Sequence, residues 1–102
     1  MGQYVKAATT DELQAGQGKL VEIEGKEIAL FHVDGQYYAI ENTCTHQGGP
    51  LCEGELEGTE VMCPWHGARF DVTSGAVLSP PAYMGVTSFP VRVSASDIEI
   101  EV

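Results

Sequence analysis

The sequence predicts an all-β domain. Two kinds of observation support this: several short apolar stretches alternate with polar residues at the period of a strand, and the 12 glycines supply many turn positions. Apolar residues spaced at the period of a helix are nearly absent. The chain of 102 residues suits one compact domain, with enough apolar residues (43%) to form a core.

The N-terminal part predicts one short helical turn followed by three strands. Thr9 and Glu12 have the spacing of a capping box, which could start a turn around Asp11–Gln14. Asp34-Gly35 is a strong hairpin signal, because both positions of a type I′ turn need positive φ. The expected strands, with turns around Gly25 and at Asp34-Gly35, are Lys19–Glu24, Glu27–Val33 and Gln36–Ile40.

The rest of the chain divides into a loop-rich middle and a regular end. In the middle, short strands are expected at Glu60–Met62, Arg69–Val72 and Ala76–Leu78. Near the C-terminus, Ser88–Ser94 and Asp97–Val102 alternate well, with Ile98, Ile100 and Val102 on one face. We therefore expect a single domain over residues 1–102, with a β scaffold (1–41 and 85–102) and a loop-rich insert (42–84).

The charge of the chain limits its partners. Fifteen acidic and five basic residues give a net charge of −10, which disfavours nucleic acid and anionic membranes. Two interpretations of this charge stay open: it attracts basic surfaces of other proteins, or it only maintains solubility. The N-terminus lacks the basic start and apolar stretch of a secretory signal, so the expected location is the cytoplasm. Three cysteines in such a chain point to metal ligation rather than to a disulfide framework.

The residues that could hold a metal lie in two short motifs within the insert. Cys44-Thr45-His46 is followed, after sixteen residues, by Cys63-Pro64-Trp65-His66-Gly67, so each motif offers one thiolate and one imidazole. Two cysteines and two histidines are the ligand set of a Rieske [2Fe–2S] centre, and they are also a common structural zinc set. The C-x-H spacing of the first motif is unusual for zinc, where C-x-x-C pairs dominate.

The stretches CTHQGGPLCEGELEG and CPWHGARFDVTSGAVLSPPA resemble the Rieske ferredoxins of bacterial ring-hydroxylating dioxygenase systems, and the resemblance covers essentially the whole chain. It implies a Rieske (ISP-like) fold, an antiparallel β-sandwich or barrel with an inserted cluster-binding subdomain. It also implies one [2Fe–2S] cluster per chain, with ligands Cys44, His46, Cys63 and His66.

The same resemblance implies a function. A ferredoxin of this kind is not itself an enzyme: it carries single electrons from an NAD(P)H-dependent flavoprotein reductase to a terminal Rieske non-haem iron oxygenase in aromatic hydrocarbon catabolism. It would be a monomer that binds these partners transiently. An alternative is the Rieske-like small subunit of a nitrite-reductase-type complex, and a structural zinc module is a third, less favoured one.

Several departures from the family pattern carry expectations. High-potential Rieske proteins bridge the two cluster loops with a disulfide, at positions that correspond here to Gly49 and Trp65, and place hydroxyl side chains where Ala68 and Phe70 stand. These differences predict a low midpoint potential. Trp65 is expected to shield the cluster from solvent.

Four further side chains have structural expectations. Arg69 and Asp71 are expected to pair and brace the second loop. Cys52 is interpreted as a small buried residue or free thiol and His32 as an ordinary strand residue.

Overall fold

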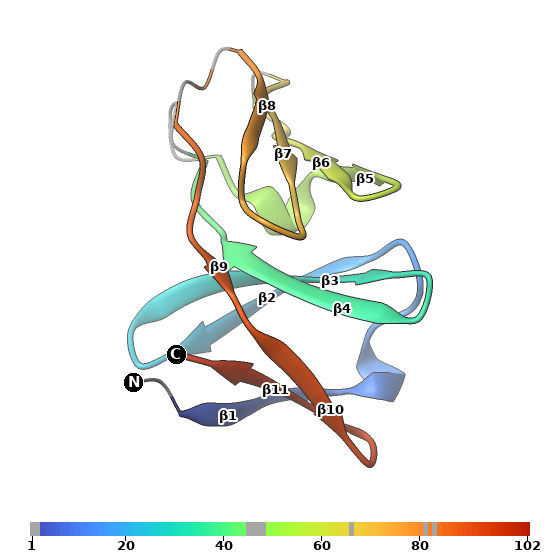
Figure 1. The fold of residues 1–102 in the computed structure, drawn as a ribbon. Helices are drawn as coiled ribbons and strands as arrows, with labels where there is room; N and C mark the ends of the chain where they lie inside the picture. Colours follow the sequence, from blue (N-terminus) through green and yellow to red (C-terminus); the bar gives the residue numbers. More distant parts are fainter. Residues whose placement is uncertain (1–2, 45–48, 66, 81, 83) are drawn as a thin grey trace.

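Three antiparallel sheets, stacked along the long direction of the molecule, make up the fold (Figure 1). The computed structural model describes residues 3–44, 49–65, 67–80, 82 and 84–102. The middle sheet has the order β2-β3-β4-β9, the lower sheet in the figure β1-β11-β10, and the upper sheet β5-β6-β7-β8. The expected all-β class is confirmed.

The middle sheet is built mainly from two tight hairpins, which form three of its strands: β2 (Gly18–Ile23), β3 (Lys26–Val33) and β4 (Gln36–Glu41). Asp34 and Gly35 both have positive φ, +48° and +83°, as the expected type I′ turn requires. Glu24 and Gly25 repeat this pattern at +52° and +80° in the preceding turn. The sequence therefore located this part of the sheet correctly.

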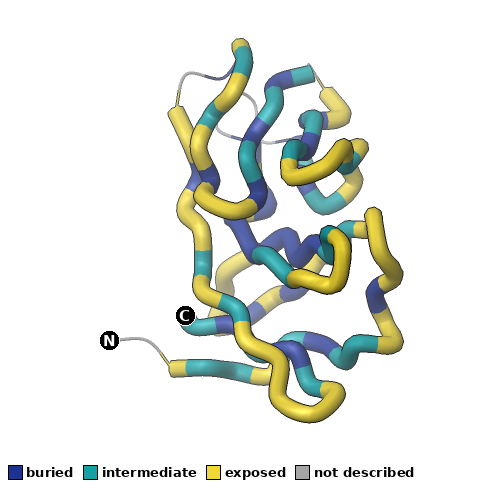
Figure 2. The backbone as a smooth tube through the Cα atoms, turned by 45° about the vertical axis from the view of Figure 1, so that its right-hand side comes forward, coloured by how far each residue is buried: buried dark blue, intermediate teal, exposed yellow. Residues whose placement is uncertain are grey.

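Strand β3 is buried on both faces, which explains its continuous apolar run. Ile28 and Leu30 pack into one core with residues of the lower sheet, including Ile98 and Ile100. Ala29 and Phe31 face the other way, into a second core shared with the upper sheet. Figure 2 shows the buried residues between the sheets and the exposed ones on the outside, in the turns and along outer strands. The middle sheet is thus the layer on which the other two are assembled.

The lower sheet joins the two ends of the chain: β1 (Tyr4–Thr9) pairs with β11 (Asp97–Glu101), which pairs with β10 (Val91–Ser94). Strand β1 was not expected from the sequence. The predicted face of β11 is confirmed, because Ile98 and Ile100 are buried and Val102 packs against the same core.

The expected single strand Ser88–Ser94 is wrong. It is two strands in different sheets: β9 (Ser88–Phe89) pairs with β4, and β10 pairs with β11. Pro90 stands between them. It has no N–H to donate, and its carbonyl accepts a bond from Glu101 N at 2.9 Å. The chain crosses from the middle sheet to the lower one at this proline.

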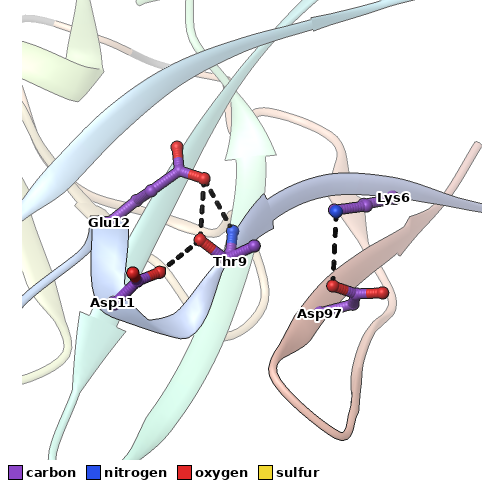
Figure 3. Close-up of polar contacts among 5 residues, drawn as sticks. All are labelled: Lys6, Thr9, Asp11, Glu12 and Asp97. Atoms are coloured by element: carbon purple, nitrogen blue, oxygen red, sulfur yellow. Dashed lines mark hydrogen bonds and ion pairs between the residues drawn. The ribbon is translucent and has the colours of Figure 1, made fainter.

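The helical turn after β1 lies slightly earlier than expected, as the 3₁₀ turn η1 (Thr10–Glu12). Figure 3 shows the contacts that hold it: Glu12 Oε2 accepts bonds from Thr9 N (3.0 Å) and Thr9 Oγ1 (2.8 Å), and Thr9 Oγ1 also contacts Asp11. The figure also shows Lys6 Nζ 3.4 Å from Asp97 Oδ1, an ion pair that joins β1 to β11. These contacts secure the N-terminal strand.

The upper sheet contains four short strands: β5 (Glu55–Glu57), β6 (Glu60–Met62), β7 (Arg69–Asp71) and β8 (Val77–Ser79). A 3₁₀ turn, η2 (Leu51–Glu53), precedes them. The hairpin of β6 and β7 was expected, whereas β5 and η2 were not. All of this sheet lies within residues 42–84, but the division into scaffold and insert stays a prediction about folding units.

Candidate metal centre

The first motif lies on a loop that leaves β4 and returns to η2. Its two sides pair: Cys44 N donates to Gly49 O at 2.9 Å, Thr43 and Pro50 form an isolated bridge, and Leu51 N donates to Asn42 O at 2.7 Å. The backbone at Cys44 is therefore fixed by its own loop. His46 lies outside the described residues.

The second motif forms a tight turn between β6 and β7. Cys63 N donates to Ala68 O at 2.7 Å, and Gly67 N donates back to Cys63 O at 3.1 Å. Gly67 has a φ of +79°, a conformation that L side chains rarely adopt, so a glycine is needed to close this turn. The sequence motif places Pro64 and Trp65 at the outside of the turn, where both are exposed. His66 lies outside the described residues.

The two loops meet at Gly49. A Cβ atom on Gly49 would lie 2.5 Å from Cys63 Sγ, closer than real Cβ atoms come, and a tight 3.2 Å from Trp65 Cγ, so a side chain here would force a shift. Gly49 is also the hydrogen-bond partner of Cys44, so one residue of the first loop contacts both cysteines of the two motifs. The fold thus brings together the two halves that are far apart in the sequence.

Both motif cysteines are enclosed by the upper core. Each is only 2% exposed, and both belong to the cluster of buried residues that contains Phe31, Val61 and Phe70. Buried thiols on two touching loops fit the two thiolate ligands of a Rieske cluster, because a cluster of this kind takes one Cys and one His from each loop. Cys44 and Cys63, the two expected ligands that the structure describes, therefore fit a Rieske cluster.

No second metal site competes with this one in the described part of the chain. Within residues 3–44, 49–65, 67–80, 82 and 84–102, no three or more His, Cys, Asp or Glu side chains gather in a way that could hold a metal ion.

The side chains that differ from the high-potential pattern lie in or beside the second turn. Ala68 and Phe70 are fully buried and have no hydrogen-bonding group in their side chains. Trp65 is 56% exposed and packs one part of its ring against Gly49. Its indole therefore covers the junction of the loops on one side and faces solvent on the other.

The expected pair of Arg69 and Asp71 is not formed. Arg69 Nη1 lies 3.6 Å from Glu60 Oε1 and 3.8 Å from Glu57 Oε1. Asp71 Oδ1 instead accepts bonds from Thr73 N (2.8 Å) and Thr73 Oγ1 (2.6 Å). Arg69 thus braces the β5–β6 hairpin, and Asp71 closes the turn after β7.

Cys52 and His32 stand where the sequence suggested. Cys52 is half-buried, and this burial, together with the charge of Glu53, raises the pKa of its thiol. His32 lies on β3, stacks on Tyr37 with ring centroids 4.4 Å apart, and has its Nδ1 3.0 Å from Leu13 O. These contacts account for His32 without a metal.

The sequence reasoning did not single out Asn42, the residue between β4 and the first loop. It is 5% exposed, and its Oδ1 accepts a bond from Cys52 N at 2.8 Å. The available signal was small: Asn42 is the middle one of three successive polar residues at the end of β4, two positions before a candidate ligand.

The few cations of the chain are already engaged. Four of them form ion pairs: Lys6 with Asp97, Lys19 with Glu12, Arg69 with Glu57 and Glu60, and Arg92 with Glu99. Lys26 lies 6.0 Å from the centroid of the Phe89 ring. The excess negative charge is therefore left to the remaining acidic side chains of the surface.

Comparisons with known proteins show the family of the chain. Residues 3–90 match the family model of the Rieske [2Fe–2S] domain. The ferredoxin component of a naphthalene 1,2-dioxygenase/salicylate 5-hydroxylase system from Ralstonia sp. is 40% identical over 90 residues, which are 88% of this chain and 86% of that protein.

Solved structures give the same result. The ferredoxin of carbazole 1,9a-dioxygenase from Nocardioides aromaticivorans IC177 superimposes with a TM-score of 0.92 at 31% identity, covering 96% of each chain. A chain from a complex of reduced oxygenase and oxidized ferredoxin in carbazole 1,9a-dioxygenase has a TM-score of 0.89 at 33% identity, covering 95% of this chain and 91% of that one. The chain belongs to the Rieske [2Fe–2S] domain family and has one Rieske cluster as its cofactor.

Proposed function

We propose that this protein carries single electrons from an NAD(P)H-dependent flavoprotein reductase to a terminal Rieske non-haem iron oxygenase that acts on aromatic compounds. The observation that carries this proposal is the full-length likeness to ferredoxin components of dioxygenase systems. One of the similar structures is itself a ferredoxin bound to its oxygenase. The cytoplasm, where such a system would have its reductant, is the proposed location.

The proposed ligands are Cys44, His46, Cys63 and His66. When bound, a Rieske cluster accepts and releases one electron, with the two thiolates on one iron and the two imidazoles on the other. Burial of Cys44 and Cys63 keeps water from the thiolates, and the contact of Gly49 with Cys63 holds the two loops together.

The protein itself would transform no substrate. An oxygenase needs a second, mononuclear iron site, commonly made of two His and one carboxylate. The chain has three histidines, of which His46 and His66 are assigned to the cluster. His32 alone remains, and it is held by Tyr37 and Leu13 O. Such a second site therefore cannot be assembled from this chain.

The surface suits brief contacts with basic partners. A net charge of −10, with every Lys and Arg in contact with another side chain of the same chain, attracts positive patches over a distance. Electron-transfer complexes are commonly small and short-lived. We therefore propose that the protein acts as a monomer and exchanges between the reductase and the oxygenase.

The test is a stepwise reduction of the purified holoprotein. Dithionite should reduce it by one electron per chain, and NADH should do so only when a catalytic amount of a flavoprotein reductase from a ring-hydroxylating dioxygenase system is present. Addition of the matching oxidised oxygenase should then reoxidise it. If dithionite reduces the protein, but the reductase does not reduce it and the oxygenase does not reoxidise it, the proposed partners are contradicted. The assignment of the cluster would then still hold.

A further inference from the structure

We infer that Asn42 is a positioning residue that fixes the first loop, and with it Cys44 and Gly49, to the middle sheet. The inference rests on the proposed ligand role of Cys44. It concerns a side chain that contacts no expected ligand directly and acts through the backbone of the loop.

Asn42 makes hydrogen bonds in three directions from one buried position. Its N donates to Glu27 O on β3 at 3.1 Å, its O accepts from Leu51 N at 2.7 Å, and its Oδ1 accepts from Cys52 N at 2.8 Å. It is the one buried polar residue within the described ranges of the chain. Asn42 therefore connects the middle sheet to both sides of the first loop.

The Asn42 side chain adds one bond to the pairing of the loop. From Asn42 toward the tip of the loop, the two sides pair through the Thr43–Pro50 bridge and the bond from Cys44 N to Gly49 O. On the returning side, the two donors after Pro50 both go to Asn42: Leu51 N to its backbone oxygen and Cys52 N to its side chain. The side-chain bond therefore fixes the end of the returning side, where η2 begins.

Leu51 and Cys52, the two residues bonded to Asn42, are also packed on the side that faces away from it. Leu51 is fully buried, and the backbone oxygen of Cys52 lies against β2, where a Cβ on Gly18 would come within 2.9 Å of it. Without the Asn42 oxygen, the N–H of Cys52 would lose its partner in this packed environment, which favours a shift of the loop toward solvent or an alternative bond.

Such a shift would reach the metal centre through Gly49. This residue lies three positions from Cys52, on the returning side of the loop, and has no space to move toward Cys63 Sγ. A displaced Gly49 would also change its bond to Cys44 N. Removal of the Asn42 oxygen is therefore expected to alter the geometry of both thiolates.

The experiment compares Asn42→Ala, Asn42→Asp and Ile98→Val with the wild-type holoprotein. Asp keeps an oxygen that can accept the Cys52 N–H bond, whereas Ala does not. Ile98 lies in the core between the middle and lower sheets, so Ile98→Val lowers stability without a change near the loop. The readouts are the rate of iron release to a chelator, the EPR line shape of the reduced cluster, and hydrogen exchange of the Leu51 and Cys52 amides.

We expect Asn42→Ala to release iron about 10-fold faster, as for other residues that orient metal ligands. Its EPR lines should broaden, and its Leu51 and Cys52 amides should exchange faster. Asn42→Asp, which keeps an acceptor for the Cys52 N–H, should release iron and exchange these amides more slowly than Asn42→Ala, and Ile98→Val should keep the wild-type line shape. The inference is overturned if Asn42→Ala releases iron at the wild-type rate, or if Ile98→Val gives the same changes. A wild-type protein without iron would contradict the proposed function instead, and the exchange rates would still test the role of Asn42.

Discussion

Gly49 of the first loop lies directly against Cys63 of the second, so closely that a Cβ at position 49 would be 2.5 Å from the Cys63 sulfur. Gly49 is not among the glycines with a positive φ, so the close contact with Cys63, and not the backbone conformation, explains the need for a glycine here. The two motifs can meet only because the first loop has no side chain at this point.

Gly49→Ala should therefore disturb the metal centre more than the fold. The added methyl group must displace Cys63 Sγ or the Trp65 ring, an overpacking that costs about 1–3 kcal/mol. We expect a folded protein that binds iron about 10-fold to 100-fold more weakly, measured as iron content and as stability toward a chelator.

The matched control is Gly58→Ala in the turn between β5 and β6. Gly58 has a φ of +62° and no atom within 4 Å of an added Cβ, so the substitution costs about 1–2 kcal/mol from the backbone alone. Full iron content in both variants would show that the contact of Gly49 with Cys63 does not matter for the cluster.

The midpoint potential should lie near the low end of the Rieske range, at roughly −150 mV. The reason is the absence of hydroxyl donors in the side chains of Ala68 and Phe70, both fully buried. Ala68→Ser should raise the potential, and Ala76→Ser, an added hydroxyl in an exposed turn, should leave it unchanged. A redox titration with a wild-type midpoint above about +100 mV would contradict this explanation.

Cys52 should react slowly with thiol reagents. Burial, with the charge of Glu53 as the second cause, raises the pKa of this thiol, so less thiolate is present in the folded protein than in the unfolded chain at the same pH. Iodoacetamide should label it slowly near pH 8.5 and faster as the pH rises further.

The same shift in the Cys52 pKa has a consequence for stability. Because the pKa of the Cys52 thiol is higher in the folded protein than in the unfolded chain, its contribution to the free energy of unfolding is complete below the unfolded pKa. That contribution is lost as pH rises through the folded pKa.

Cys52→Ser should remove the alkylation in the holoprotein and keep the cluster. Loss of the cluster in Cys52→Ser would show that this cysteine has a role that its position does not suggest.

Electron transfer with the partners should depend on ionic strength. The acidic excess of the chain attracts basic surfaces over roughly 10 Å at 0.1 M salt, and more salt screens this attraction. The second-order rate of reduction by the reductase, measured by stopped flow, should fall as salt is raised from low to physiological concentration. A rate that rises, or does not change, would indicate that the partner is not recognised through charge.

The parts of the fold that the sequence predicted are those with local signals. Asp34-Gly35 fixes a hairpin by its own conformational preference, and Ile98 and Ile100 alternate clearly. Strand β1 was missed because its sequence, YVKAAT, is short and rich in small residues, and it exists through its pairing with β11. The break at Pro90 was also missed, because the alternation continues across it although the strand does not.

The candidate site shows the same division. The spacing of Cys44 and Cys63 with their neighbouring histidines could be recognised from the sequence. The ion pairs of Arg69 could not be predicted, because the β5–β6 hairpin brings Glu57 and Glu60 to it. The Asp71 carboxylate accepts hydrogen bonds from Thr73 instead. The role of Asn42 also depends on partners that only the folded chain supplies.

The most direct test of the central claim, a cluster with mixed Cys and His ligation, is EPR spectroscopy of the dithionite-reduced protein together with its metal content. We predict a red-brown protein with about two irons per chain that bleaches on reduction, with an average g value below that of four-cysteine ferredoxins. His66→Cys should lower the potential and change this spectrum. A colourless protein that contains one zinc per chain, or a His66→Cys variant with an unchanged spectrum and potential, would contradict the claim.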